Sequence, residues 1–179
     1  MNIFVGCSSR DVGNKLYNSV ADKVGEYIAK NGHNFVFGGC GEGLMGRIYS
    51  IVKKGKGRVI ATQAKIYKEQ VMKLDVDKVD ILDTINERKD KYLEYSDILV
   101  FIPGGIGTID ELINAIETRR SGEHTNHIII VNEDNFFGDF LNMLDKIYSE
   151  GLASNSTKEL YYIANNVEDA IKKLDEICK

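Results

Sequence analysis

The sequence predicts a Rossmann-like α/β fold of the doubly wound class, with a mostly parallel sheet, helices on both faces and one domain over residues 1–179. Short apolar runs alternate with amphipathic stretches, the pattern of repeated strand–helix–strand units. The short runs are apolar throughout, as in a sheet covered on both faces. Two glycine-rich turns, 38–43 and 103–107, each follow such a run, at the end of a strand where doubly wound proteins bind ligands.

The first strand and helix have the clearest pattern. An apolar run predicts a strand at residues 3–7, and the stretch over 12–30 predicts a helix. Four apolar residues recur at every fourth position of that helix: Leu16, Val20, Val24 and Ile28. Asn31 and Gly32 then provide the stop that a helix end requires. We therefore expect these four side chains to face the sheet.

The remaining elements continue the alternation. Further strands are expected at 34–37, 58–62, 78–82, 98–102, 127–131 and 161–163. Further helices are expected at 44–54, 86–95, 109–120, 136–149 and 167–177, and residues 66–73 should form a short helix or a lid. Since helices join consecutive strands, the connections should be right-handed.

Composition limits the class of partner. The chain is 43% hydrophobic and 28% charged, as soluble globular proteins are, and its net charge of −4 argues against nucleic acid. No apolar segment reaches the length of a membrane span, and residues 3–5 begin a strand in place of a signal peptide, so we expect a cytoplasmic protein. Cys7, Cys40 and Cys178 lack a metal-binding or disulfide pattern, and we interpret them as small core or loop residues.

The most informative stretch runs from residue 98 to residue 111. An apolar strand is followed by Pro103, the chain's single proline, then by three glycines and Thr108. A strand, a glycine turn and a helix together direct free backbone N–H groups at an anion, so we expect phosphate to bind there. Asp110 and Glu111 are expected in the first helical turn, where one acid is available for chemistry on an attached sugar.

Simpler interpretations compete with this one. Thr108 and Glu111 have the spacing of a capping box, and either acid could only oppose the helix dipole. The charged run over 87–91 could be a solvated helix end with local ion pairs. However, the helix and strand after it return the chain to the same edge of the sheet, where Arg88 could pair with Glu111. Ser8, in the loop after the first strand, either contacts ligand or caps the next helix.

Several cofactor classes are excluded by motif. A G-x-G-x-x-G pattern over residues 41–46 follows the second strand, and the acid that NAD binding requires about 20 residues later is missing. Neither glycine turn carries the lysine of a P-loop. Pyridoxal phosphate needs a Schiff-base lysine and a partner for its ring nitrogen, and no such pair is identifiable. We expect neither a cofactor nor a metal.

Four ordered blocks between residue 3 and about residue 150 resemble the Lonely Guy family, often labelled lysine decarboxylase-like. P-G-G-x-G-T-x-x-E is complete at Pro103–Glu111, and G-G-x-x-x-G-L-M-G is complete at Gly38–Gly46. E-R-K stands at Glu87–Lys89, and Gly6–Ser9 resembles the C-G-S-S turn. The family's M-H and T-W-x-Q-L stretches are replaced here, which leaves the preferred base open.

The resemblance implies a homodimer that cleaves the N-glycosidic bond of a nucleoside 5′-monophosphate to a free base and ribose 5-phosphate. The implied substrate is a cytokinin riboside 5′-monophosphate or AMP, and the implied catalytic residues are Arg88 and Glu111. The implied substrate and phosphate contacts are Lys89, Gly104, Gly105, Ile106, Gly107, Thr108, Glu69, Ser8, Gly39 and Met45. A non-catalytic nucleotide-binding or molybdenum-cofactor carrier protein is the alternative, and retention of both Arg88 and Glu111 favours the enzyme.

Overall fold

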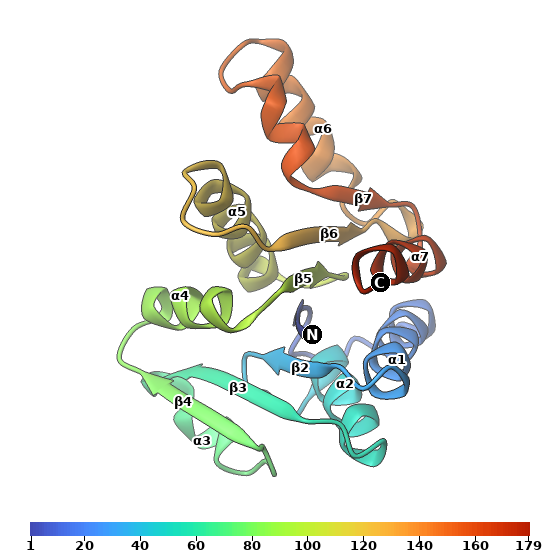
Figure 1. Ribbon diagram of the computed structural model, residues 1–179, viewed down its shortest axis with the longest axis vertical. Helices are drawn as coiled ribbons and strands as arrows, with labels where there is room; N and C mark the ends of the chain where they lie inside the picture. Colours follow the sequence, from blue (N-terminus) through green and yellow to red (C-terminus); the bar gives the residue numbers. More distant parts are fainter.

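A seven-stranded sheet in the order β4-β3-β2-β1-β5-β6-β7 forms the centre of the computed structural model, which describes residues 1–179 (Figure 1). All neighbouring strands run parallel. The doubly wound fold is therefore confirmed, with a sheet that is parallel throughout. The strand order changes direction between β1 and β5, the point at which such sheets bind ligands.

The strands are rich in β-branched and aromatic residues, which pack well on a pleated surface. Their bounds are β1 Asn2–Gly6, β2 Asn34–Phe37, β3 Val59–Ala64, β4 Lys78–Leu82, β5 Ile98–Phe101, β6 His127–Val131 and β7 Tyr162–Ala164. Every residue of β3 and β5 is buried, whereas the edge strand β4 is partly exposed. All seven expected strands are present, and β3 extends two residues beyond its expected end.

Helices cover both faces of the sheet (Figure 1). One face carries α1 Lys15–Lys30, α2 Gly43–Lys54 and α7 Val167–Ile177, and the other carries α4 Ile85–Tyr95, α5 Ile106–Arg120 and α6 Gly138–Ser149. Residues 66–73, expected as a short helix or a lid, form the short helices η1 Lys65–Tyr67 and α3 Lys68–Val71. Two further short helices, η2 Glu133–Asn135 and η3 Asn155–Leu160, lie in loops.

Helix α1 begins three residues later than its apolar pattern predicts. Gly13 has a left-handed backbone with φ of +61°, and the Asn14 side chain accepts hydrogen bonds from the amides of Leu16 and Tyr17 at 2.9 and 3.2 Å. Asn14 is therefore the N-cap. Leu16 consequently lies in the first turn and is 42% exposed, so its expected place on the buried face is wrong. Val20, Val24 and Ile28 are buried as expected.

Helix α5 begins three residues earlier than its apolar pattern predicts. Gly105, with an extended backbone, is the N-cap, and Ile106 is the first helical residue. Ile106 is 90% exposed and so adds nothing to the buried stripe that marks a helix in sequence. The first turn therefore holds neither Asp110 nor Glu111, and the capping box of Thr108 with Glu111 does not form.

All three cysteines are free, and Cys7 and Cys40 are buried, as their interpretation as core or loop residues requires. No helix combines the length and apolar composition needed to cross a membrane.

Candidate functional site

Three loops meet at the carboxyl end of the sheet, after β1, β2 and β5. The Ser8 amide donates to the Pro103 carbonyl at 3.3 Å, and the Met45 amide donates to the Ser8 carbonyl at 3.2 Å. These bonds join the loop after β1 both to the glycine turn after β5 and to the start of α2. The two glycine turns therefore share one edge of the sheet, as the sequence predicts.

Arg88 of α4 and Glu111 of α5 form an ion pair at this edge. Their side chains are 13% and 6% exposed, so the pair is largely shielded from water. Two glycines at strand ends leave room for it. A Cβ on Gly38 would stand 2.6 Å from Arg88 Nη1, and one on Gly6 would stand 3.3 Å from Glu111 Oε2. The pairing predicted from the sequence is thus confirmed, and it lies over the ends of β1 and β2.

Burial controls the electrostatics of this pair. Burial raises the pKa of the Glu111 carboxyl above its ordinary value, against the opposing effect of the Arg88 guanidinium. Burial, and then the Glu111 charge, also raise the pKa of the Cys7 thiol. A carboxylate with a raised pKa beside a fixed cation is typical of a functional site.

Tyr92 contacts the backbone of Glu111, a contact that was not predicted from the sequence. The Tyr92 ring is fully buried and stacks on Phe4 with 4.0 Å between ring centroids. Its hydroxyl donates to the backbone carbonyl of Glu111 at 3.4 Å. The sequence contains a signal for this role of Tyr92: it follows Arg88 by four residues, so the two side chains lie on one face of α4.

A second ion pair joins α4 to α5 directly beside the first. Lys89 Nζ lies 3.0 Å from Asp110 Oδ1, with the side chains 9% and 51% exposed. The interpretation of 87–91 as a solvated helix end is therefore wrong for Arg88 and Lys89, which both point into cross-helix pairs. It holds for Lys91, which pairs locally with Glu94 at 2.5 Å.

The start of α5 is open to solvent. Gly105, Ile106 and Gly107 are exposed, and the first amides of a helix have no partner within it. Apart from adjacent residues and the backbone of α5 itself, no heavy atom lies within 4 Å of the place where a Cβ would stand on Gly105 or Gly107. Thr108 differs, since it is 3% exposed and packs against Gly104. The open glycine positions leave a space of the kind that an anion can fill.

The other predicted contacts are distributed around this edge. Ser8 Oγ bonds only within its own loop, donating to the Arg10 carbonyl at 3.0 Å and accepting from the Arg10 amide at 3.1 Å, so its alternative role as a helix cap is wrong. Met45 is 7% exposed and lies, like Arg88, against Gly38. Gly39 has φ of +76° and faces Val71 of α3. Glu69, also on α3, is exposed, and no ion pair brings it to Arg88.

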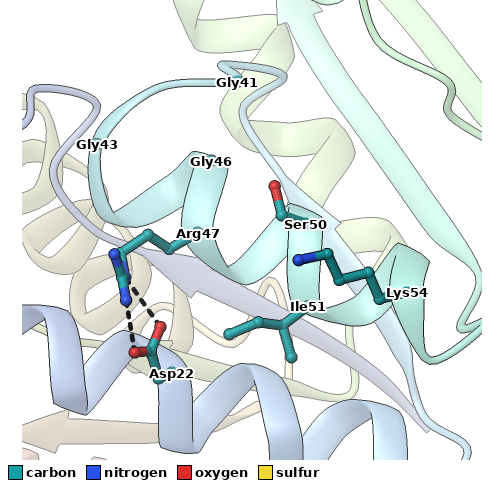
Figure 2. A pocket seen from close by; sticks show the side chains of 8 residues that line it. All are labelled: Asp22, Gly41, Gly43, Gly46, Arg47, Ser50, Ile51 and Lys54. Carbon is teal, nitrogen blue, oxygen red and sulfur yellow. Dashed lines mark hydrogen bonds and ion pairs between the residues drawn. The ribbon is translucent and has the colours of Figure 1, made fainter.

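A separate hollow of about 370 Å³ lies where α1 meets α2 (Figure 2). Within it Arg47 donates two hydrogen bonds to the Asp22 carboxylate, at 2.8 and 2.6 Å. Neither Arg88 nor Glu111 lines this hollow. No group of three or more His, Cys, Asp or Glu side chains is arranged to bind a metal ion.

Comparison with known proteins gives a consistent family. Residues 45–174 match the family model described as possible lysine decarboxylase. The cytokinin riboside 5′-monophosphate phosphoribohydrolase LOG of Oryza sativa subsp. japonica is 29% identical, over 97% of this chain and 72% of that protein. The cytokinin riboside 5′-monophosphate phosphoribohydrolase LOG3 of Arabidopsis thaliana is 28% identical, over 97% of this chain and 81% of that protein.

Solved structures with the same fold include two proteins of another function. The Moco carrier protein from Chlamydomonas reinhardtii has a TM-score of 0.71 and 19% identity, covering 99% of this chain and 96% of that one. The molybdenum cofactor binding protein from Rippkaea orientalis has a TM-score of 0.68 and 18% identity, with the same coverage. At such identities the likeness shows the fold alone.

Proposed function

The chain belongs to the Lonely Guy family, whose model is described as possible lysine decarboxylase, and from this premise we propose that it is a nucleoside 5′-monophosphate phosphoribohydrolase. The proposed substrate is a cytokinin riboside 5′-monophosphate or AMP, and the products are the free base and ribose 5-phosphate. The observation that carries the proposal is the buried Arg88–Glu111 pair beside the open start of α5.

Glu111 is the proposed catalytic carboxylate. Breaking the bond between C1′ and the base nitrogen builds positive charge on the ribose, which a carboxylate stabilises. Water adds to C1′ while Glu111 accepts one of its protons, and the base leaves with the bonding electrons and takes up that proton when Glu111 releases it. Arg88, already paired with Glu111, favours the charged form of that carboxylate against the larger opposing effect of burial, and it fixes the orientation of the carboxylate. The raised pKa of Glu111 suits a group that must accept and release a proton.

The phosphate is proposed to lie against the amides of Gly105, Ile106, Gly107 and Thr108. A helix start favours an anion through its free N–H groups and its dipole. Binding energy from this remote group positions the sugar for reaction. Four further proposed contacts lie on neighbouring loops and helices: Lys89, Ser8, Gly39 and Met45. Glu69 of α3 is the fifth of these proposed contacts.

A homodimer through α5 is also proposed. Leu112 and Ile116 face the core, whereas Ile113 is 42% exposed and Ile109 is half-buried. The outward part of this face is available to a second copy. Light scattering at micromolar concentration should give twice the chain mass, and a single species of 20.1 kDa would contradict the dimer.

The alternative is a nucleotide-binding or molybdenum-cofactor carrier protein without turnover. The carrier proteins resemble this chain at 18–19% identity, whereas the phosphoribohydrolases do so at 28–29% over most of both chains. The enzyme is therefore the better supported function.

Incubation with AMP and with isopentenyladenosine 5′-monophosphate separates the two functions. We expect catalytic release of the free base, measured by chromatography, and loss of that release in Glu111→Gln. Tight binding of either nucleotide with no base released over many enzyme equivalents would favour the carrier.

A further inference from the structure

The hollow between α1 and α2 is polar and has no part in the site at the start of α5 (Figure 2). Its volume of about 370 Å³ lies within the range of small-molecule pockets. Its walls come from one residue of α1, four of α2 and three glycines between β2 and α2: Asp22, Arg47, Ser50, Ile51, Lys54, Gly41, Gly43 and Gly46. Only one large apolar side chain, that of Ile51, is among them, so polar groups dominate what a ligand would meet.

The three glycines form a closely packed wall of the hollow. A Cβ on Gly46 would stand 2.1 Å from the Gly41 carbonyl oxygen. Gly43 has φ of +61°, and a Cβ there would stand 2.7 Å from the backbone of Arg10. These are the glycines of the G-x-G-x-x-G pattern, so the pattern here marks close backbone packing beside the hollow. The wall is therefore fixed by the protein before any ligand arrives.

Lys54 and Ser50 form a cationic end of the hollow. They are exposed and four residues apart, on one face of α2, and Figure 2 shows the Lys54 side chain running back along the helix toward Ser50. The neighbouring Lys53 lies 3.1 Å from Asp75, whereas Lys54 forms no ion pair. A free ammonium group beside a hydroxyl suits the oxygens of a phosphate group.

Arg47 and Asp22 form an end with no positive excess. Arg47 Nε and Nη2 donate to the two carboxylate oxygens of Asp22 at 2.8 and 2.6 Å, which leaves both N–H groups of Nη1 available. The two side chains are 44% and 31% exposed, and the charge of Asp11 also acts on Arg47. Such a pair offers donors and acceptors together, which suits hydroxyl groups better than a second anion.

We propose that this hollow binds a small sugar phosphate, with its phosphate at Lys54 and Ser50 and its hydroxyl groups at Arg47 and Asp22. Residues 47 and 54 are two turns apart on α2, about 10 Å along the axis, and the Lys54 side chain shortens the span. A pentose phosphate is long enough to contact both ends. The site does not depend on the proposed function, since neither catalytic residue lines it.

Nuclear magnetic resonance of the ¹⁵N-labelled full chain tests the proposal. Ribose 5-phosphate is titrated, with ribose and inorganic phosphate as separate ligand controls. Amide signals of Gly41, Gly46 and Ser50 report on the hollow, and those of Gly105 and Gly107 report on the start of α5. We expect saturable shifts at the hollow with a Kd of about 1 mM. Binding there of ribose or phosphate alone should be about fivefold weaker or more.

Three variants assign the binding to its side chains. Lys54→Gln removes the free cation and should weaken binding at the hollow about fivefold or more. Arg47→Gln removes the free donors and should also weaken it. Lys53→Gln removes the same charge one residue away, from a lysine that pairs with Asp75 and does not line the hollow, and should change nothing. If Arg47→Gln gives a poorly dispersed spectrum, Lys54→Gln still decides the test.

Shifts confined to Gly105 and Gly107, equal binding of inorganic phosphate alone at the hollow, or equal weakening in Lys53→Gln would overturn the inference. Failure of the inference can be told from failure of the proposed function, because the titration needs no turnover. Base release from AMP without shifts at the hollow rejects the sugar-phosphate site alone. Shifts at the hollow that Lys54→Gln weakens, in a protein that releases no base, support this site and reject the hydrolase.

Discussion

The two glycine turns occupy equivalent places in the fold but use glycine for different reasons. In the turn after β2, glycines make room for the protein's own atoms. A Cβ on Gly38 would meet Arg88, and one on Gly46, in the first turn of α2, would lie 2.1 Å from the Gly41 carbonyl oxygen. In the turn after β5, a Cβ on Gly105 or Gly107 would meet no atom within 4 Å beyond the adjacent residues and the backbone of α5.

The difference separates a structural turn from a binding turn. Gly105 and Gly107 are required neither by neighbouring atoms nor by a left-handed backbone, so their missing side chains leave space for something outside the protein. Each turn also contributes to the ion pair, because Arg88 lies against Gly38 and Glu111 is carried by the helix that follows the β5 turn. Substitutions in the β2 turn and in the β5 turn should therefore have different effects on turnover, on ligand affinity and on stability.

Removing the Glu111 charge should have the largest effect. Glu111→Gln keeps size and hydrogen bonding, and base release should fall about 100-fold or more, or about 3 kcal/mol in the barrier. Nucleotide binding should survive, since the amides of the β5 turn hold the phosphate. Steady-state base release and equilibrium binding measure the two separately. Unchanged base release would mean that Glu111 is only a partner for Arg88.

Removing the Arg88 side chain, which lies against Gly38 of the β2 turn, should lower both turnover and nucleotide binding. Arg88→Ala leaves Glu111 buried without its cation, so the carboxylate is neither oriented nor kept charged. Combining it with Glu111→Gln should be little worse than the poorer single variant, because residues that act as a unit are not additive. Additive losses in kcat/KM would show that the two side chains act independently.

Alanine at one glycine of each region should give opposite results. Gly46→Ala forces a Cβ into the Gly41 backbone and should destabilise the fold by about 2 kcal/mol or more. Gly107→Ala lies in a helix with open space around it and should stabilise the fold by up to about 1 kcal/mol.

For Gly107→Ala, ligand affinity should fall although stability rises. The added Cβ of Gly107→Ala fills the proposed phosphate space, so phosphate affinity should fall about tenfold, equivalent to about 1.4 kcal/mol. Urea unfolding and calorimetry measure stability and affinity in turn. Full phosphate affinity in Gly107→Ala would show that the β5 turn is not the binding turn.

The sequence predicted the architecture because its strands are short apolar runs and its helices have one apolar face. The sequence-based prediction was wrong at the starts of α1 and α5, because the spacing of apolar residues does not show where a helix begins. Gly13 and Asn14 delay α1 through a left-handed residue and a side-chain cap. Solvent-facing Ile106 conceals the true start of α5, and with it the position of Glu111 in the second turn.

The site was predicted as far as topology brings residues to one edge of the sheet. Pairing of Arg88 with Glu111 follows from that topology, and the structure confirms it. Pairing of Lys89 with Asp110, and the support from Tyr92, depend on which way side chains turn between two helices. That geometry is set by tertiary packing, which one sequence does not contain.

The pH dependence of stability gives the smallest expected effect and tests burial at the β5 side of the site. Burial raises the folded-state pKa of Glu111 above its ordinary value of 4.5. Between pH 4.5 and the raised pKa, the folded state therefore binds more protons than the unfolded state. The contribution of Glu111 to the free energy of unfolding is fully present below pH 4.5, and it is lost as pH rises through the raised pKa.

The glutamine side chain of Glu111→Gln does not titrate, so the unfolding midpoint of this variant should rise relative to wild type as pH increases from about 4.5 to about 7. Exposed Glu117, whose pKa is lowered from 4.5 by its hydrogen bond with Arg120, loses its contribution only below pH 4.5, so Glu117→Gln should give a flat difference over the range from pH 4.5 to about 7. Thermal unfolding of both variants and the wild type across this range measures the slope for Glu111→Gln against this control. A flat or falling difference for Glu111→Gln would mean that the attraction of Arg88 outweighs the cost of burial.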